Sequence, residues 1–314
     1  MPCPTILGRI VSVNGFAPPE RIGFVGLGNM GTPMASRLAR AGFRLAVADA
    51  APGAVMRFAA QVSCETPATL AELGACRAVV TMLPDGHSVR QVLLGEHGIA
   101  AHLRADSVVI DMSSSSPIET RATAAALKER AIEMVDAPVS GGVPKAIDGT
   151  LAIMAGGEAE VVARCRPLLD ALGKVFLAGP TGCGHAMKSL NNFLSAINLA
   201  AAAEAVLAGE RFGLAPQVMI SILNASTGRN SATEQKYPAY VLPRNFASGF
   251  TLGLMAKDLK LAVELARSTQ TPARLLELCS QLWSEASERL GARADNTEIV
   301  RFLEELAVVH GAQR

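Results

Sequence analysis

The sequence predicts an α/β protein in which a doubly wound N-terminal domain with a parallel sheet precedes an all-α C-terminal domain. Two observations carry this prediction. Short apolar runs alternate with helical patterns up to about residue 180, and only long Ala-, Leu- and Glu-rich segments follow. Such alternation is typical of a parallel sheet with right-handed crossovers. The domains are expected at residues 21–182 and 183–314, with residues 1–20 as an extension outside the fold.

The predicted strands are mostly continuous apolar runs, as expected for strands that are covered on both faces. They are Arg21–Val25, Arg44–Ala48, Ala78–Leu83, Val108–Asp111, Glu133–Asp136, Leu151–Ala155 and Lys174–Leu177. The helices expected between them are Pro33–Ala41, Ala68–Leu73, Ser88–Leu94, Pro117–Glu129 and Ala159–Leu172. The helices expected in the second domain, which Pro and Gly residues separate, are Gly184–Phe212, Pro216–Asn224, Met255–Ser268, Pro272–Leu290 and Thr297–Leu306.

Composition and charge exclude several classes of protein. Half of the 314 residues are hydrophobic and 18% are charged, which excludes general disorder. The 29 basic and 28 acidic residues are interspersed and aromatic residues are few, so no nucleic-acid partner is expected. The six scattered cysteines fit neither a disulfide framework nor a zinc site, so no metal and a reduced, cytoplasmic location are expected. Residues 1–20 make a poor signal peptide, and the apolar run Phe193–Ala208 is too short to span a membrane.

The strongest motif lies between the first strand and the first helix and consists of Gly26, Leu27, Gly28, Asn29, Met30 and Gly31. Its three glycines have separate roles in a dinucleotide-binding Rossmann turn. The first permits the tight turn, the second lets the backbone approach the pyrophosphate, and the third allows the helix to pack on the strand. The alternative is a Gly-rich turn that binds nothing. The context of a strand before it and a helix after it favours dinucleotide binding.

Asp49 ends the second strand, about 20 residues after the glycines, where a carboxylate would bind the hydroxyls of the adenine ribose. No Arg or Lys follows at positions 50–54, so a 2′-phosphate would meet only repulsion there. NAD is therefore the expected cofactor, with NADP less favoured. The other interpretation of Asp49 is a helix N-cap ahead of Pro52.

Three further loops follow predicted strands, at the edge where open α/β sheets bind their ligands. Leu83 and Pro84 could form a rigid wall beside the cofactor, and Ser114 could offer it a hydroxyl. Taken singly, each of these two loops is better explained as an ordinary turn at the end of a strand. In the third loop, Ser140, Gly141 and Gly142 could present a hydroxyl and several backbone N–H groups to a carboxylate.

The start of the next helix carries Gly184, Lys188, Asn191 and Asn192 on one face, by i, i+4 and i+3 spacing. A glycine inside a helix costs on the order of 1 kcal/mol relative to alanine, so something is expected to approach it closely. Lys188 could exchange a proton with a substrate hydroxyl, and Asn191 could orient the hydroxyl or the lysine. Because a free lysine has a pKa near 10.4, burial or a nearby positive charge must lower it. The alternative is a solvated polar face.

These motifs together resemble the β-hydroxyacid dehydrogenase family, which includes 3-hydroxyisobutyrate dehydrogenases and tartronate semialdehyde reductases. The matching segments are Phe24–Met34, Met82–Pro84, Asp136–Gly142, Gly184–Asn192 and Met255–Leu259, in the family's order. The resemblance implies catalysis by Lys188 and substrate binding by Ser140, Gly141, Gly142 and Asn192. It also implies cofactor or substrate contacts from Ser114, Phe250, Lys257 and Asp258, and a homodimer or homotetramer formed through the helical domain.

The chain departs from the family in three places. His185 stands where many relatives have Gln, and it is either a polar replacement or a group that tunes Lys188. The segment Ser226–Ser231 lacks the aromatic residue of hydroxyisobutyrate-type enzymes, so a more polar distal pocket is expected. Met112 and Ser113 interrupt the usual Asp-Ser-Ser-Thr pattern but keep a hydroxyl.

Other functions remain open at this point. A semialdehyde reductase or a dehydrogenase of threonate-like sugar acids would share every site residue named above. A 6-phosphogluconate enzyme is less favoured because those chains are much longer and need a phosphate site. A protein of another class, a non-catalytic NAD-binding scaffold, would not need Lys188, Asn191 and Asn192, and their presence argues against it.

Overall fold

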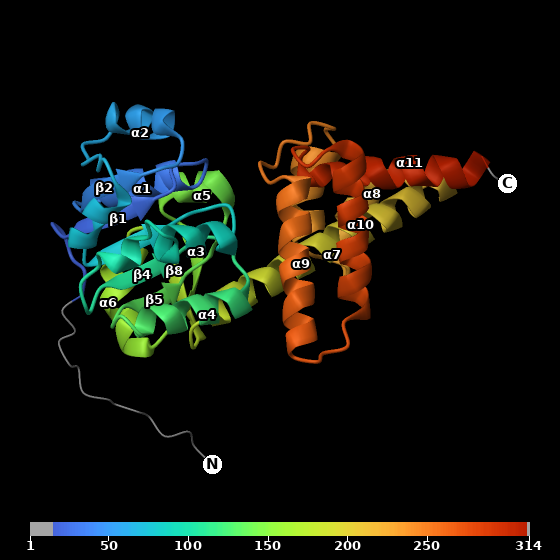
Figure 1. Ribbon diagram of the computed structural model, residues 1–314. Coiled ribbons are helices and arrows are strands. Elements are labelled where there is room, and N and C mark those ends of the chain that lie inside the picture. The colour runs from blue at the N-terminus through green and yellow to red at the C-terminus, as the bar shows by residue number, and fades with distance from the viewer. Residues whose placement is uncertain (1–14, 313–314) are drawn as a thin grey trace, which may run out of the picture.

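One sheet of eight strands forms the centre of the N-terminal lobe (Figure 1). The computed structural model describes residues 15–312 of the chain. The strands are β1 (Arg21–Val25), β2 (Arg44–Ala48), β3 (Ala78–Thr81), β4 (Val108–Asp111), β5 (Glu133–Asp136), β6 (Val139–Ser140), β7 (Leu151–Gly156) and β8 (Gly173–Gly179). Their order is β2-β1-β3-β4-β5-β7-β6, and β8 pairs with β7. The first five strands are parallel, as predicted.

The prediction of a wholly parallel sheet is wrong at its far edge. There β7 runs antiparallel to both β5 and β6, and only β8 returns parallel to β7. The connection from β6 to β7 explains the difference. It spans residues 141–150 and holds the short helix α5 (Gly142–Asp148), whereas a parallel crossover needs a dozen or more residues.

Helices cover both faces of the sheet and complete its core. One face packs against α1 (Gly31–Arg40), α5 and α6 (Ala159–Asp170). The other packs against α3 (Gly86–Leu94), α4 (Pro117–Lys128) and the 3-10 helices η1 (Leu70–Ala75) and η2 (Ile99–Ala101). The helix α2 (Pro52–Ala59) follows β2. Because both faces are covered, β3 and β4 are buried along their whole length.

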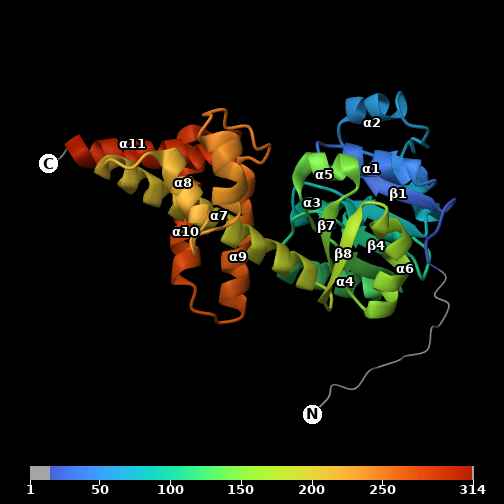
Figure 2. The ribbon, with the colours of Figure 1, turned by 180° about the vertical axis from the view of Figure 1, so that it is seen from behind.

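The C-terminal lobe is helical, and the long helix α7 (Cys183–Phe212) enters it from the sheet lobe (Figures 1 and 2). Its other helices are α8 (Pro216–Asn224), α9 (Leu252–Ser268), α10 (Arg274–Leu290) and α11 (Ile299–Ala312), with the π-helix η3 (Ala232–Val241) and the short η4 (Asn296–Glu298). Trp283 and Tyr237 are fully buried in its apolar core. Between residues 180 and 312 the structure contains no strand, which agrees with the prediction.

The helices α2 and α5, the strand β6 and the π-helix η3 were not predicted. The predicted helix Ala68–Leu73 is instead a 3-10 helix, which Thr69 and Glu72 begin as a capping box. The remaining elements agree with their predicted ranges to within a few residues, except that the last helix extends well past Leu306. Helix ends are the least certain part of such predictions, because caps and tertiary contacts decide them.

The prediction that residues 1–20 lie outside the fold is wrong for the part that the structure describes. Phe16 is fully buried in the core of the sheet lobe. Its backbone N–H donates to the Arg164 carbonyl at 2.9 Å, and the guanidinium groups of Arg77 and Arg164 lie 5.5 and 5.4 Å from its ring centre. An aromatic side chain gains enough from burial to hold the segment before β1 against the domain. Residues 1–14 lie outside the described range.

By length and composition alone, α7 could cross a membrane, since its most apolar window has a mean hydropathy of 1.3. The helices that bury the core of a protein pass the same test. Here α7 packs against α9 in one lobe and β7 in the other, and its buried residues include the polar His185, Ser189 and Asn192. These contacts describe a core helix that joins the two lobes.

Candidate functional site

The Gly-rich turn after β1 has the form that the fingerprint predicts. Gly26 has a φ of +102°, and a Cβ on it would overlap the Met82 carbonyl. A Cβ on Gly31 would overlap the Gly26 carbonyl, so a side chain there would push α1 away from the turn. Around Gly28, in contrast, nothing lies within 4 Å of a Cβ position. The turn is closed at its two ends and open at its centre, which suits the approach of a pyrophosphate.

Asp49 connects the end of β2 to this turn. Its Oδ2 accepts a hydrogen bond from the Leu27 N–H at 2.6 Å, and its Oδ1 accepts one from the Ala51 N–H at 2.7 Å. The N-cap of α2 is Ala51, so Asp49 is not the helix cap. The carboxylate therefore lies at the turn, where ribose hydroxyls are expected. In α2, which follows, a guanidinium nitrogen of Arg57 lies 3.1 Å from the position that a Cβ on Gly53 would take.

The loops after β3 and β4 are joined to each other. Leu83 donates its backbone N–H to the Ser113 hydroxyl at 2.9 Å. Below them Asp111 is fully buried and organises the second loop, since it accepts from Thr81, from the Ser113 N–H and from the Ser115 hydroxyl. Only Ser114 in this loop is partly exposed. The two predicted loops therefore form one wall at the carboxyl edge of the sheet.

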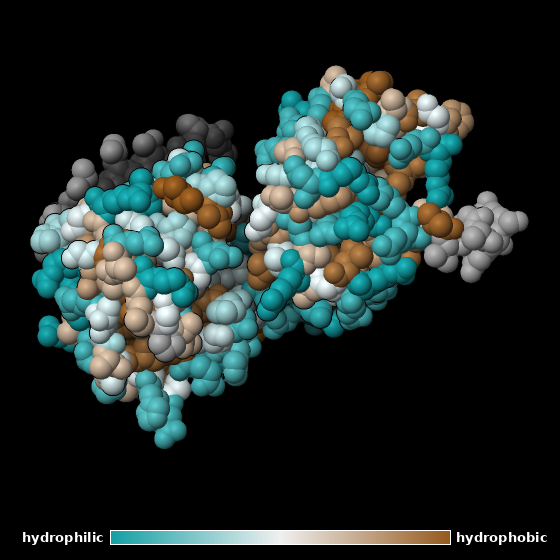
Figure 3. Space-filling view, turned by 90° about the horizontal axis from the view of Figure 1, so that it is seen from above, coloured by the Kyte–Doolittle hydropathy of each residue, from teal (hydrophilic) through white to brown (hydrophobic). Residues whose placement is uncertain are grey.

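Lys257, on α9, reaches this wall from the other lobe. Its Nζ donates to the Pro84 carbonyl and to the Ser114 carbonyl, both at 2.8 Å. The two lobes meet across a groove when they are seen from above (Figure 3). Four predicted cofactor-contact residues (Leu83, Pro84, Ser114 and Lys257) are thus brought together at this groove.

The start of α7 is anchored to the end of β5 by a buried carboxylate. Asp136 accepts from the backbone N–H groups of Gly182 at 2.7 Å and His185 at 2.8 Å, which are among the unpaired donors at the helix start. Burial raises the pKa of Asp136, while His185 and these backbone donors oppose the rise. A Cβ on Gly184 would overlap the carbonyls of Met154 and Asp136. The close approach expected at Gly184 is therefore an approach of α7 to the sheet.

His185 belongs to the same anchor. Its ring is buried, with Nδ1 2.8 Å from the Thr120 hydroxyl and Nε2 3.1 Å from the Ser113 carbonyl. Carboxylate oxygens of Asp111 and Asp136 lie 3.7 and 3.8 Å from the ring nitrogens. Both nitrogens are thus engaged within the sheet lobe. His185 joins α7 to α4 and to the loop that presents Ser114, which agrees better with a structural replacement than with a proton-transfer group.

Lys188 lies one turn beyond this anchor and is partly buried. Burial lowers the pKa of its amine, the ammonium of Lys257 lowers it further, and the Asp258 carboxylate opposes both. Within the described residues no hydrogen bond involves its Nζ. A lysine with a lowered pKa and a free amine is a better proton acceptor than an ordinary lysine at the same pH.

The amides on the same face form a chain that ends at Asp258. Asn191 donates its side-chain N–H to Asn192 Oδ1 at 3.2 Å, and Asn192 donates to Asp258 Oδ2 at 2.5 Å. Asp258 is buried, its Oδ1 lies 3.5 Å from Lys257 Nζ, and no hydrogen bond from a described residue reaches that oxygen. The structure therefore gathers Lys188, both asparagines, Lys257 and Asp258 around one point between the lobes.

Two sets of predicted residues stand apart from these contacts. Ser140 ends β6, and Gly141 and Gly142 follow it with φ values of +133° and +69°, conformations that favour glycine. Gly141 and Gly142 are exposed and Ser140 is partly buried, and among the described residues no hydrogen bond joins these three residues to Lys188. Phe250 lies just before α9, where its carbonyl accepts from the N–H and side chain of Asn296.

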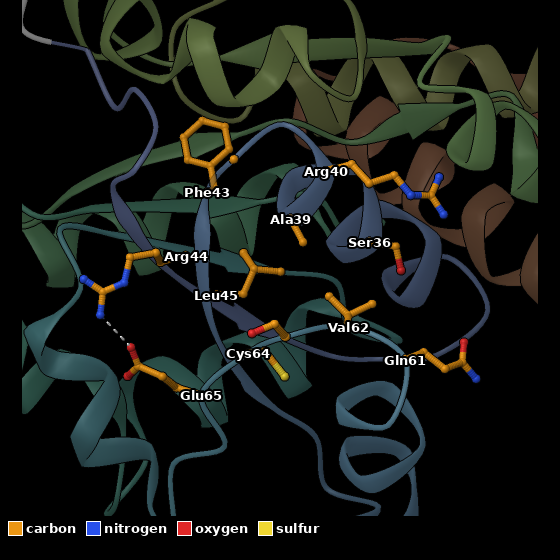
Figure 4. A pocket seen from close by; sticks show the side chains of 12 residues that line it. Ser36, Ala39, Arg40, Phe43, Arg44, Leu45, Gln61, Val62, Cys64 and Glu65 are labelled. Atoms are coloured by element: carbon orange, nitrogen blue, oxygen red, sulfur yellow. Dashed lines mark hydrogen bonds and ion pairs between the residues drawn. The ribbon is translucent and has the colours of Figure 1, made fainter.

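A separate cavity lies elsewhere. It has a volume of about 660 Å³ and is lined by residues of α1, of β2 and of the segment 61–65 (Figure 4). An ion pair between Arg44 and Glu65, 3.2 Å long, bounds it. Arg44 is the first residue of β2, so the cavity is at the amino edge of the sheet. Ligands of doubly wound sheets bind at the carboxyl edge, and the cavity is therefore distinct from the candidate site.

Comparison with known proteins gives two matching family models, which together cover most of the chain. The NAD-binding domain of 6-phosphogluconate dehydrogenase matches residues 21–183. The NAD-binding domain of NADP-dependent 3-hydroxyisobutyrate dehydrogenase matches residues 182–303. The boundary between the two matches coincides with the start of α7.

Individual relatives match over nearly their full length. The 2-(hydroxymethyl)glutarate dehydrogenase of Eubacterium barkeri is 36% identical, over 92% of this chain and 96% of the relative. The NAD-dependent L-serine dehydrogenase of Pseudomonas aeruginosa is 38% identical, over 84% and 91%. A structure of Mycobacterium tuberculosis 3-hydroxyisobutyrate dehydrogenase with L-serine has a TM-score of 0.85 and 31% identity, covering 90% of this chain and 99% of that one.

Proposed function

The chain belongs to the β-hydroxyacid dehydrogenase family, and on this premise we propose that it transfers a hydride between NAD and a small β-hydroxy acid, with Lys188 as general acid and base. The observation that carries the proposal is the position of Lys188. Its amine has a lowered pKa and lies with Asn191, Asn192, Lys257 and Asp258 at the groove that the cofactor loops border. A scaffold protein would not need this cluster.

The residues present fit a bound dinucleotide. The open space at Gly28 suits the pyrophosphate, and Asp49 lies where the adenine ribose is expected. Pro84, Ser114 and Lys257 would border the nicotinamide end. When bound, nicotinamide supplies the hydride acceptor or donor.

The chain's own residues would handle the proton and position the substrate. In oxidation the neutral Lys188 amine takes the proton of the substrate hydroxyl while the hydride leaves the same carbon. In reduction the protonated amine returns that proton to the nascent alkoxide. Asn191 and Asn192 would hold the hydroxyl in line, because the chain to Asp258 fixes their amide groups. Ser140, Gly141 and Gly142 would bind the carboxylate through a hydroxyl and backbone N–H groups.

The experiment that tests this function measures the formation of NADH and NADPH by the purified protein. A panel of 3-hydroxy acids would include L-serine, 3-hydroxyisobutyrate and threonate, and the corresponding semialdehydes would be assayed in reverse. Turnover with NAD by the wild type, and its loss in the Lys188→Ala variant, is the expected result. Tight NAD binding without turnover of any substrate would favour the scaffold function.

The preference for NAD over NADP is predicted to depend on Asp49. Its replacement by serine should lower kcat/KM for NAD by about tenfold or more, because one charge-assisted hydrogen bond to a ribose is lost. The same change should raise the relative use of NADP. Arg57→Ala is the matched variant, since Arg57 is the nearby cation that could reach a 2′-phosphate. An unchanged ratio of NAD to NADP use in the Asp49→Ser variant would contradict this role of Asp49.

Lys257 is predicted to hold the two lobes together over the cofactor. The variant Lys257→Met loses both hydrogen bonds to the sheet lobe, each from a charged donor, so kcat/KM should fall about tenfold to hundredfold. Steady-state kinetics with the cofactor as the varied substrate checks this. Lys260→Met is the control, because Lys260 lies on the same helix and is exposed. Equal effects of the two variants would contradict the role of Lys257.

A homodimer or homotetramer and a cytoplasmic location stay predictions. The surface of the helical lobe supports the first of them. Large apolar side chains are exposed on α7, α8 and α10, including Leu194, Ile222, Leu275 and Leu278. Such side chains are typical of surfaces that bury one another in an assembly. Light scattering of the purified protein would decide the oligomeric state.

A further inference from the structure

A second lysine with a lowered pKa lies in the helical lobe, and the proposed mechanism does not use it. Lys236 projects from the π-helix η3, and irregular helices of this type are often found at functional sites. Its Nζ lies 3.4 Å from the Ser195 hydroxyl and 3.2 Å from Asn296 Oδ1. The side chain is only partly buried, so one of its three ammonium donors can serve a ligand.

The partners of Lys236 place it along the substrate side of α7. Ser195 follows Lys188 by seven residues, which is two helical turns, so both residues occupy the same face, about 10 Å apart along the axis. Asn192 lies between them and binds Asp258. The other partner, Asn296, donates its amide to the Phe250 carbonyl. Lys188, Asn192 and Ser195 therefore follow one another along one face of α7. Lys236 lies beside Ser195, at the end of this face that is farther from Lys188.

No carboxylate neutralises Lys236 directly in the part of the chain that the structure describes. Asp295 is the acidic group whose charge acts on it, and no ion pair among the described residues joins the two. Both Asp295 oxygens are already occupied, by the hydroxyl of Ser248 and by backbone N–H groups of Gly249 and Thr297. Burial lowers the pKa of Lys236 to about 8, against the opposing effect of Asp295. A partly buried cation with neutral partners is costly unless an anion joins it.

We propose that Lys236 is the distal anion-binding residue of the substrate pocket, and that the preferred substrate is a β-hydroxy acid carrying a second carboxylate. The first carboxylate and the hydroxyl would bind near Lys188. The second would accept a hydrogen bond from the Lys236 ammonium, with Ser195 beside it. The polar segment Ser226–Ser231 that precedes η3 is compatible with such a pocket.

This inference rests on the proposed function, and its test compares two substrates that differ only at the distal end. One is 2-(hydroxymethyl)glutarate, and the other is 2-(hydroxymethyl)pentanoate, in which a methyl group replaces the distal carboxylate. We expect the wild type to favour the diacid in kcat/KM. The Lys236→Met variant should lose about tenfold to hundredfold in kcat/KM for the diacid and change less than about threefold for the monoacid. Lys236→Arg should restore part of the preference, and Lys260→Met should leave it unchanged.

The pH dependence gives a second readout. Because kcat/KM reports the free enzyme, the ratio of diacid to monoacid should fall as the pH rises through about 8, where Lys236 loses its proton. The effect of Lys188 is common to both substrates and cancels in the ratio. Asp295 is the charged group that acts on Lys236. The residue of α7 that contacts the Lys236 amine is Ser195, which is neutral. The ratio in Lys236→Met should not vary with pH.

A binding measurement separates the failure of this inference from that of the proposed function. With NAD present, glutarate should raise the unfolding midpoint of the wild type more than pentanoate does, and this difference should vanish in Lys236→Met. One outcome is that the wild type turns over no hydroxy acid while glutarate still stabilises it more than it stabilises Lys236→Met. In that case the distal site is supported and the catalytic proposal fails. Equal losses for both substrates, or a wild type that does not prefer the diacid or glutarate, would show that Lys236 has only a structural role.

Discussion

Replacing Lys188 with alanine should lower kcat/KM by about a thousandfold in both directions of the reaction, since a positioned acid–base group contributes 10²–10⁴-fold. The substitution removes the group that accepts the proton of the hydroxyl and that stabilises the alkoxide. Substrate and cofactor binding should change much less, because the glycine-rich turn and Asn192 remain. Initial rates with saturating cofactor, together with NADH binding by fluorescence, check both statements.

The pH profile of the wild type follows from the same residue. Burial lowers the pKa of Lys188, so its neutral form is available below the pH at which an ordinary lysine loses its proton. Oxidation needs the neutral amine and should therefore rise with pH and level off above the lowered pKa. Reduction needs the ammonium and should fall over the same range. These opposite limbs should both disappear in Lys188→Ala.

Lys188→Arg is the informative companion variant. Arginine keeps a positive charge but does not release its proton in this pH range. Oxidation should then be lost as fully as in Lys188→Ala, whereas reduction could retain the part that a fixed cation supplies. An arginine variant that oxidises substrate at a tenth of the wild-type rate or faster would show that Lys188 is not the base.

The second large effect is expected from Gly184→Ala. A Cβ at this position would overlap two backbone carbonyls, those of Met154 and Asp136, and neither can rotate away. Overpacking of this kind costs about 1–3 kcal/mol or more, of which the better helix propensity of alanine returns up to about 1 kcal/mol. The variant should unfold at lower urea concentration. It should also lose activity, because a displaced start of α7 moves Lys188.

Gly209→Ala on the same helix is the matched control. Its Cβ would meet the end of the Met219 side chain, which is flexible and can move aside. The gain in helix propensity is the same, so this variant should be neutral or slightly more stable than the wild type. If both variants behave alike, the contact between α7 and the sheet is not what requires a glycine at position 184.

Much of the N-terminal lobe could be predicted because its signals are local. The three glycines of the first turn and the carboxylate of Asp49 lie within about 25 residues of one another, and the buried runs of β3 and β4 are each four residues long. Each depends on backbone geometry that a short segment imposes by itself. The helical face that carries Lys188, Asn191 and Asn192 was predictable for the same reason, since helical periodicity alone places them together.

Other parts of the site depend on contacts between distant segments. Lys257 reaches Ser114 from 143 residues away in the sequence, and Asn192 binds Asp258 across 66 residues. Asp136 appeared only as the end of a strand, yet it anchors the first turn of α7. The periodicity of the sequence does not predict such contacts, because they depend on where two elements that are distant in the sequence pack against each other.

What the sequence by itself determined was therefore the alternation of strands and helices, the dinucleotide turn and the polar face at the start of α7. The tertiary structure decided the reversal of β7, the burial of Phe16 and the position of Lys236 in line with Lys188. The physical reason is the range of the interactions. Backbone conformation and periodicity are set by neighbours in the chain, whereas burial, charge pairing and pKa shifts are set by whichever residues the fold brings within a few ångströms.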